Sequence, residues 1–317
     1  MAYNLDDLTA YVNEQGLPLL AKSLFEAKTT SLVAKQLGVK GTNALNLMNQ
    51  TTTFVYGNSC GFNASTNETT FSQRNITAVH VKVHEALCPS ELENYWMQSQ
   101  LPAGSMYTSV PFEQQYVEEK LKSIKKALET AVWQGDGSGT PASITGFASI
   151  ASSASVIDLN QSTYGWSTDL SFATLISTPS NAIKLLNTFE TYMPADIIGH
   201  DDVVVFCGWD VFRAVKQGLV AENYFNPAYL SGAEAGEITF PASNIRLIAV
   251  HGLNGTYDLY GGRLSNFVFG TDLANEEENF EIYYDPSDRN VKFVCEFKAG
   301  TQIAFPDQMR RFMMAAS

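Results

Sequence analysis

Apolar residues recur at helical spacing through one long stretch of the chain, residues 110–133. The recurring positions, at intervals of four, three, four and three residues, are Val117, Leu121, Ile124, Leu128 and Ala131. Glutamates and lysines occupy the opposite face, Pro111 stands at a helix start, and Gly135 ends the pattern. A helix of this length extends roughly 36 Å at about 1.5 Å per residue. The pattern therefore predicts an amphipathic spine helix, well above the average helix in length.

A weaker helical pattern occupies the amino-terminal arm, residues 1–47. Its first stripe consists of Leu5, Leu8 and Val12. Gly16 follows as a stop signal, and Pro18 begins a second helical stretch that extends to about Leu37. We expect this arm to be helical and modest in apolar content.

The period changes to two in residues 48–86. Thr51–Tyr56 is a run of β-forming residues, and residues 76–84 alternate between apolar and polar positions. Three valines share one face of the second run, and the other face carries His80, Lys82 and His84. A polar segment separates the two runs, so the pattern predicts a long hairpin with a polar tip. Because such a hairpin buries little by itself, it needs support from another surface.

A glycine-rich segment, residues 135–139, separates the spine helix from an α/β pattern. In that pattern helices are expected at 181–192 and 209–219, and strands at 202–207 and 245–251. The chain then returns to β, with strands expected at 264–269, 280–284, 291–297 and 301–305. The order of segments predicts an α+β fold. Its five parts are 1–47, 48–86, 87–139, 140–258 and 259–317.

Composition changes this picture in one respect, the low density of charge. Only 17% of the 317 residues are charged, while 45% are hydrophobic; about a quarter of residues are charged in typical soluble domains. A chain that covers much of its surface with copies of itself needs less surface charge. The net charge of −13 opposes non-specific adhesion to nucleic acid and suits the wall of a container for DNA.

One motif fits a catalytic pattern. Residues 57–61, Gly-Asn-Ser-Cys-Gly, match the G-x-S-x-G of a nucleophile elbow. That elbow needs a helix directly after the serine, but the residues that follow Ser59 are polar turn formers. We interpret the motif as the hairpin tip. A hydrolase that uses Ser59 is the alternative from a different functional class.

Metal and phosphate sites are disfavoured by the spacing of the residues that would form them. His80 and His84 flank Lys82 on a predicted strand, and a cation between two ligands opposes metal binding. The acidic run 276–278 lacks the ligand spacing of a calcium loop. Residues 135–139 lack the Lys-Ser/Thr of a phosphate loop. We therefore expect no enzyme activity, no cofactor and no metal.

The cysteines, the first residues and the lengths of the apolar runs indicate the cellular compartment in which the chain folds. Cys60, Cys88, Cys207 and Cys295 show no CxxC or zinc-finger spacing and are typical of reduced thiols in a cytoplasm. The first residues lack the pattern of a secretory signal. No apolar run approaches the roughly 20 residues that cross a bilayer, so we expect no membrane partner.

The order of these parts resembles the Hong Kong 97-like fold of tailed-bacteriophage major capsid proteins, which encapsulin shells share. The most specific local likeness is the segment 290–300 running into Ile303–Pro306, which is similar to the closing strands of phage capsid proteins. The resemblance implies that residues 48–86 are an extended loop lying over an adjacent subunit. It also implies a peripheral domain, 87–139 with 259–317, and an axial domain over the residues between them.

The resemblance carries a function with it. It implies a virion shell subunit, made in the host bacterial cytoplasm, that assembles as hexamers and pentamers around double-stranded DNA. Scaffolding, portal and decoration proteins would be its other partners. An encapsulin-like compartment shell and another virion structural protein are the alternatives.

Candidate residues for contact between subunits follow from charge. If the hairpin lies across a neighbour, its basic face should meet acidic surface, because the chain has 33 acidic and 20 basic residues. The basic candidates are His80, Lys82 and His84; the acidic candidates are Glu118, Glu119, Glu276, Glu277 and Glu278. A Lys–Asn crosslink, known in one branch of the family, is assigned to no pair.

Overall fold

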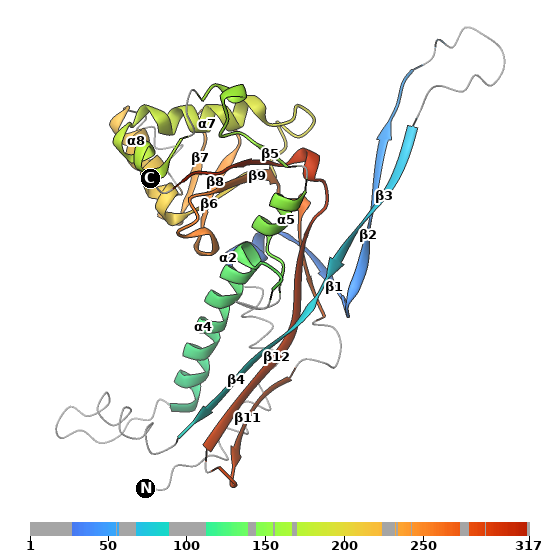
Figure 1. Cartoon of the computed structure of the whole chain (residues 1–317), viewed down its shortest axis with the longest axis vertical. Helices are drawn as coiled ribbons and strands as arrows, with labels where there is room; N and C mark the ends of the chain where they lie inside the picture. Colours follow the sequence, from blue (N-terminus) through green and yellow to red (C-terminus); the bar gives the residue numbers. More distant parts are fainter. Residues whose placement is uncertain are drawn as a thin grey trace.

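A computed structural model describes residues 27–54, 56, 68–88, 112–138, 144–154, 156–166, 170–223, 232, 234–241, 243–272, 279–288 and 290–315. These residues form an elongated unit around one long helix, a more compact lobe at one end of it, and a narrow ribbon that projects away from both (Figure 1). The mixture of helices and strands confirms the predicted α+β class.

The elongated unit is a five-stranded sheet covered by a helix. Its strands are β1 (Ala34–Leu37), β4 (Val79–Leu87), β10 (Phe267–Thr271), β11 (Asn279–Asp285) and β12 (Asn290–Ile303). The long strand β12 organises the sheet, because it pairs antiparallel with β4, β10 and β11. Residues 291, 293, 295 and 297 of β12 are buried and those between them are partly exposed. One face of the sheet is therefore apolar and needs a cover.

Helix α4 (Phe112–Gln134) provides that cover and confirms the predicted spine (Figure 1). Its apolar stripe is buried at Val117, Leu121, Ile124, Leu128 and Ala131. Near its end, Trp133 contacts the rings of Phe147, Phe206, Tyr260 and Phe267, at centroid distances of 5.1 to 6.0 Å. Two of these rings belong to lobe strands, so one continuous core joins the spine helix to the lobe.

The lobe is built on a six-stranded sheet. In the order β5-β13-β9-β6-β8-β7, its strands are Ile157–Asp158, Arg310–Phe312, Leu259–Arg263, Val203–Gly208, Arg246–Val250 and Glu237–Thr239. Its helices are α6 (Phe172–Ser177), α7 (Ser180–Tyr192) and α8 (Trp209–Ala221), whereas α5 (Phe147–Ser153) contacts α4 and β12. β6 is buried at every residue. The predicted α/β pattern is confirmed, and the end of the chain adds β13 to this sheet.

The projecting ribbon consists of β2 (Thr42–Thr51) and β3 (Glu68–Thr77), paired antiparallel along their whole length. The predicted pairing of residues 51–56 with 76–84 is wrong. Residues 79–87 instead form β4, which pairs with β12. The physical reason is the valine face of β4: Val81 and Val83 contact the core under α4, which an exposed ribbon cannot offer. The tip motif around Ser59 lies outside the described residues.

The described part of the amino-terminal arm is less helical than predicted. α2 (Lys28–Leu32) is short, and β1 begins two residues after it. β1 pairs parallel with β10, so hydrogen bonding to an open sheet edge prevails over the helical pattern up to Leu37. The expected helix over residues 4–15 and the start of the second one lie outside the described residues.

Candidate assembly surfaces

Three basic side chains of β4 converge on one carboxylate of β12. Lys82 and Glu296 are direct partners in the antiparallel register, and Lys82 Nζ lies 3.1 Å from Glu296 Oε1. His84 Nε2 lies 3.1 Å from the same oxygen, and His80 Nε2 lies 3.6 Å from Oε2. The hydrogen bond from Lys82 is the main reason that the pKa of Glu296 lies below its ordinary value. These four residues, here called the basic strip, lie on the face of the sheet away from α4.

The basic strip gathers three basic side chains around a single carboxylate. A single ionised Glu296 faces one lysine and two histidines, and the side chains of Lys82 and His84 are about half exposed. Lys298, opposite His80 in the register, adds a fourth basic group and lies 3.8 Å from the buried Asp272. The strip therefore presents exposed basic side chains to a partner surface.

The acidic candidates are distributed differently from the basic ones. Glu119 pairs with Lys122 on the exposed face of α4, at 2.7 Å, and Glu118 is exposed on the same helix. Residues 276–278 lie outside the described residues. Within the described chain the strip meets Glu296, which the sequence pattern did not single out. Only the register of β4 on β12 identifies that glutamate.

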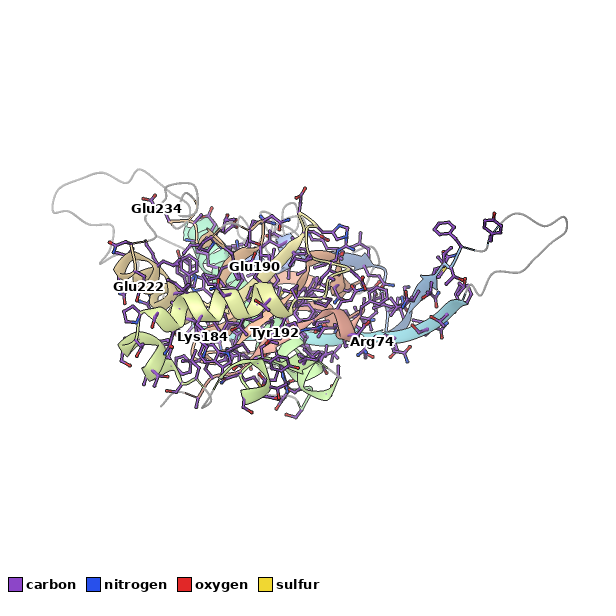
Figure 2. All side chains as sticks on the ribbon, turned by 90° about the horizontal axis from the view of Figure 1, so that it is seen from above. Arg74, Lys184, Glu190, Tyr192, Glu222 and Glu234 are labelled. Carbon is purple, nitrogen blue, oxygen red and sulfur yellow. The ribbon has the colours of Figure 1, made fainter. Side chains whose placement is uncertain are left out.

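The ribbon exposes large apolar side chains. Met48 and Phe71 face each other across β2 and β3, with exposed fractions of 60% and 79%. Phe54, just beyond β2, is almost completely exposed. At the base of the ribbon Arg74 donates a hydrogen bond to Gln302 of β12, and Figure 2 shows the ribbon extending beyond Arg74. Apolar groups on an unsupported ribbon indicate a surface that another chain covers.

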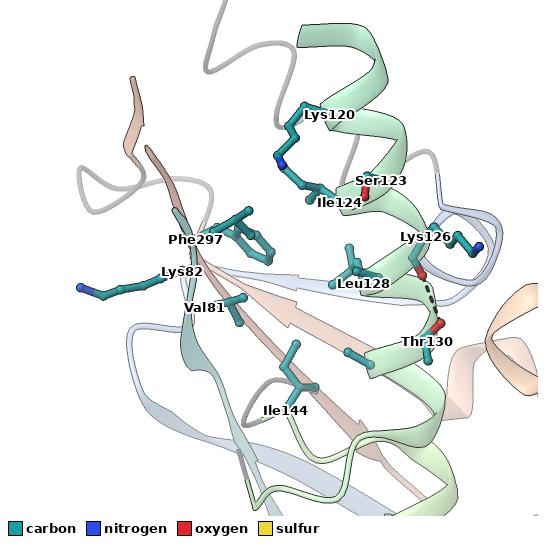
Figure 3. Close-up of a pocket in the computed structure, with 13 residues that line it drawn as sticks. Val81, Lys82, Lys120, Ser123, Ile124, Lys126, Leu128, Thr130, Ile144 and Phe297 are labelled. Atoms are coloured by element: carbon teal, nitrogen blue, oxygen red, sulfur yellow. Dashed lines mark hydrogen bonds between the residues drawn. The ribbon is translucent and has the colours of Figure 1, made fainter. Parts of the chain in front are cut away.

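A second apolar surface lies between α4 and β4. It is a groove of about 530 Å³ whose apolar walls include Val81, Ile124, Leu128 and Phe297 (Figure 3). Lys82 also borders it, but Figure 3 shows its side chain directed away from the helix. The lining of this groove is mostly apolar and suits packing against another apolar surface. Among the described lining residues there is no arrangement of nucleophile, base and orienting group that would indicate catalysis.

The described residues also contain no group of three or more His, Cys, Asp or Glu side chains placed to hold a metal ion. None of the helices in the described ranges is long and apolar enough to cross a membrane. Burial raises the pKa of the Cys207 thiol, which opposes formation of a thiolate nucleophile there. The exposed ribbon and the basic strip are the candidate functional surfaces that the described residues offer.

Comparison with known proteins identifies structures that share the fold of this chain. No family model matches the chain, and no curated protein matches it. A chain of the satellite phage P4 procapsid, which includes the size determination (Sid) protein, is similar at 8% identity with a TM-score of 0.59. The match covers 96% of this chain and all of that one.

Two further solved structures give similar values. The capsid of the empty GTA particle shows 9% identity and a TM-score of 0.55, over 92% of this chain and 90% of that one. Microbacterium phage Oxtober96 shows 15% identity and a TM-score of 0.56, over 91% and 90%. At such identities the likeness concerns the fold alone. The chain has the fold of tailed-phage major capsid proteins, as the order of its parts indicated.

Proposed function

We propose that the chain is a major capsid protein that assembles with copies of itself into a closed shell. The observation that carries the proposal is the extent of the structural likeness: 96% of this chain aligns with the whole of a procapsid chain. A likeness over nearly the full length leaves little of this chain outside the shared fold.

The exposed surfaces support the same proposal. A two-stranded ribbon that buries little by itself gains stability when a neighbour covers it. Met48 and Phe71 give the ribbon an apolar contact face, and the basic strip gives the adjacent sheet a charged one. The rigid spine between them, α4 on β12, would hold these contact faces at a fixed separation.

The finer parts of the proposal rest on the resemblance to phage capsid proteins. We propose hexamers and pentamers of this chain in the head of a tailed phage, around double-stranded DNA. Scaffolding, portal and decoration proteins would be further partners, and the virion would be its location. The net charge of −13 supports the role, because a wall of like charge does not hold the packaged polyanion. We propose no enzymatic role.

Electron microscopy of the purified full-length chain tests the proposal. The chain would be expressed alone and together with its phage's scaffolding protein, and particles would be imaged in negative stain. Closed shells of uniform diameter are the expected result. Open tubes, isolated rings or a permanent monomer under both conditions would contradict it. Shells that consistently enclose a co-purified enzyme would instead favour the compartment alternative.

A further inference from the structure

The loop over residues 251–256 carries the single Asn-Gly pair of the sequence, Asn254 and Gly255. Such a pair is prone to spontaneous deamidation, because glycine has no Cβ atom to hinder attack by its own backbone nitrogen. Asn254 is exposed, so water can reach it. The loop begins with the short helix η2 (His251–Leu253), which packs against α4 where the spine meets the lobe. A covalent change in this loop therefore acts on that junction.

Deamidation proceeds by ring closure and then hydrolysis. The backbone nitrogen of Gly255 attacks Cγ of Asn254 and closes a succinimide ring, while the side-chain NH₂ group takes up the displaced proton and leaves as ammonia. Water, the one co-reactant, then opens the ring at either carbonyl carbon and yields aspartate or isoaspartate. Ring closure requires the Gly255 nitrogen to lie on the same side of the Cα–C bond as the Asn254 side chain.

The folded structure holds the two reacting groups away from this geometry. Asn254 has a ψ angle of 132°, which turns the Gly255 nitrogen away from the Asn254 side chain. The Gly255 N–H donates a hydrogen bond of 3.1 Å to Asp210 Oδ2, and Arg213 holds the other oxygen of that carboxylate at 2.8 Å. The carboxamide oxygen of Asn254 accepts a hydrogen bond of 2.8 Å from the backbone amide of Trp209. Ring closure has to break these hydrogen bonds and rotate the backbone.

The same contacts join the spine to the lobe. Gln134, the last residue of α4, donates a hydrogen bond of 2.6 Å to the backbone oxygen of Gly252 and lies 3.4 Å from that of Asn254. Trp209 and Asp210 are the first residues of α8 in the lobe. The backbone rotation that ring closure needs is therefore opposed as long as α4, the loop and α8 stay in contact.

We propose that Asn254 is a gated deamidation site, protected while the spine and the lobe are joined and converted when this junction opens. Isoaspartate inserts the Cβ atom of the residue into the backbone, so the loop becomes longer directly after η2. The lengthened loop no longer matches the contacts with Gln134 and Trp209. Conversion thus opposes reclosure of the junction and records, irreversibly, that it has opened.

Peptide mass spectrometry on unassembled full-length subunits tests the proposal. Subunits would be incubated at mildly alkaline pH with and without denaturant, and the conversion of Asn254 would be followed together with its isoaspartate content. We expect conversion to be slower in the folded subunit by a factor of about ten or more, because only the open fraction reacts. Equal rates in the two states, or an unmodified Asn254 in denaturant, would overturn the proposal.

Removal of one hydrogen-bond acceptor tests the local protection. Asp210→Ala leaves the Gly255 N–H without its partner and should raise the conversion rate several-fold in the folded subunit, with no change in denaturant. Asp196→Ala, at another exposed aspartate of the lobe, is the matched control. A wild-type rate in folded Asp210→Ala subunits, with a wild-type circular dichroism spectrum, would refute the proposed protection.

A substitution at the junction tests the gate itself. Gly252→Ala should also raise the folded-state rate, because its Cβ atom would overlap the backbone oxygen of Glu129 and force the loop away from α4. Gly41→Ala, whose Cβ atom meets nothing within 4 Å, is the control. Wild-type conversion in folded Gly252→Ala subunits would show that the junction does not control the site. These measurements use single subunits, so their outcome is independent of shell formation.

Discussion

The backbone amide of Thr29 lies 3.2 Å from the carboxylate of Glu129, a residue one hundred positions later in the chain. The Thr29 hydroxyl also donates to this carboxylate and accepts a hydrogen bond of 2.7 Å from Trp133 Nε1. All three groups are buried. A single ionisable group at the centre of the molecule therefore joins the first described helix to the spine.

Burial raises the pKa of Glu129 above its ordinary value of 4.5, although the hydrogen bonds from Thr29 act in the opposite direction. The folded protein thus holds this proton more tightly than the unfolded chain. Its contribution favours folding at low pH and is lost as pH rises from 4.5 through the raised pKa. Glu129→Gln should abolish that part of the pH dependence, measured by denaturant unfolding at a series of pH values.

Glu119→Gln is the matched control, because Glu119 is exposed on the same helix. Identical pH profiles for wild type and Glu129→Gln would contradict the assignment. Glu129→Ala should instead cost about 1 to 3 kcal/mol at neutral pH, because it leaves the buried amide of Thr29 without its acceptor.

Gly252→Ala should destabilise the junction between the spine and the lobe. A Cβ atom at residue 252 would overlap the backbone oxygen of Glu129 and the ring of Trp133. Because α4 would have to move from the lobe, we expect a loss of about 2 to 3 kcal/mol in the free energy of unfolding. Gly41→Ala is the control, since its Cβ would meet no atom within 4 Å. Equal stability of the two variants would show that the junction is compliant.

Leu128→Asp should prevent recovery of folded subunits. Leu128 is 3% exposed on the covered face of α4, so the change places an unpaired carboxylate in the core. A loss of more than about 4 kcal/mol is expected, and Leu121→Asp should act in the same direction. Ser123→Asp, on the exposed face, is the control for the added charge. Soluble, cooperatively unfolding Leu128→Asp protein would mean that the helix face is misassigned.

Lys82→Glu should slow shell assembly without unfolding the subunit. The substitution sets two carboxylates opposite each other on β4 and β12 and gives the basic strip a net negative charge. Because the pKa of Glu296 is lowered, the ion pair contributes above the ordinary glutamate pKa and is lost as pH falls through the lowered value. Light scattering would follow assembly, with circular dichroism as the folding control. Assembly at the wild-type rate would show that the strip is merely solvated.

Removing the apolar pair of the ribbon should block assembly and spare the subunit. Met48→Thr with Phe71→Thr keeps strand propensity but removes the exposed apolar contact face. Unfolding of the monomer should change by less than about 0.5 kcal/mol, because both side chains are largely exposed. Asn46→Thr with Gln73→Thr, the neighbouring pair on the same ribbon, is the matched control. Normal shells from the Met48 and Phe71 double variant, seen by electron microscopy, would remove the ribbon from the proposed contact.

The sequence pattern alone was sufficient to predict a helix or strand whose burial follows a regular pattern along that one element. The spacing of Val117, Leu121 and Leu128 predicted α4 because a helix of 3.6 residues per turn places those positions on one face. The apolar run of residues 203–206 predicted β6 from the opposite signal, because a strand buried on both faces is apolar at every position. The order of these elements along the chain was then enough to indicate the capsid fold.

Tertiary structure decided which strand pairs with which, because pairing joins residues far apart in the sequence and leaves no local pattern. Alternation predicted a strand over residues 76–84 and assigned it to the hairpin. In the structure residues 79–87 form the strand, and it pairs with β12, where its valines contact the core under α4. That pairing alone brings Glu296 to Lys82. The contact of Glu129 with Thr29 has the same origin: a carboxylate in a charged helical sequence looks solvated until another segment covers it.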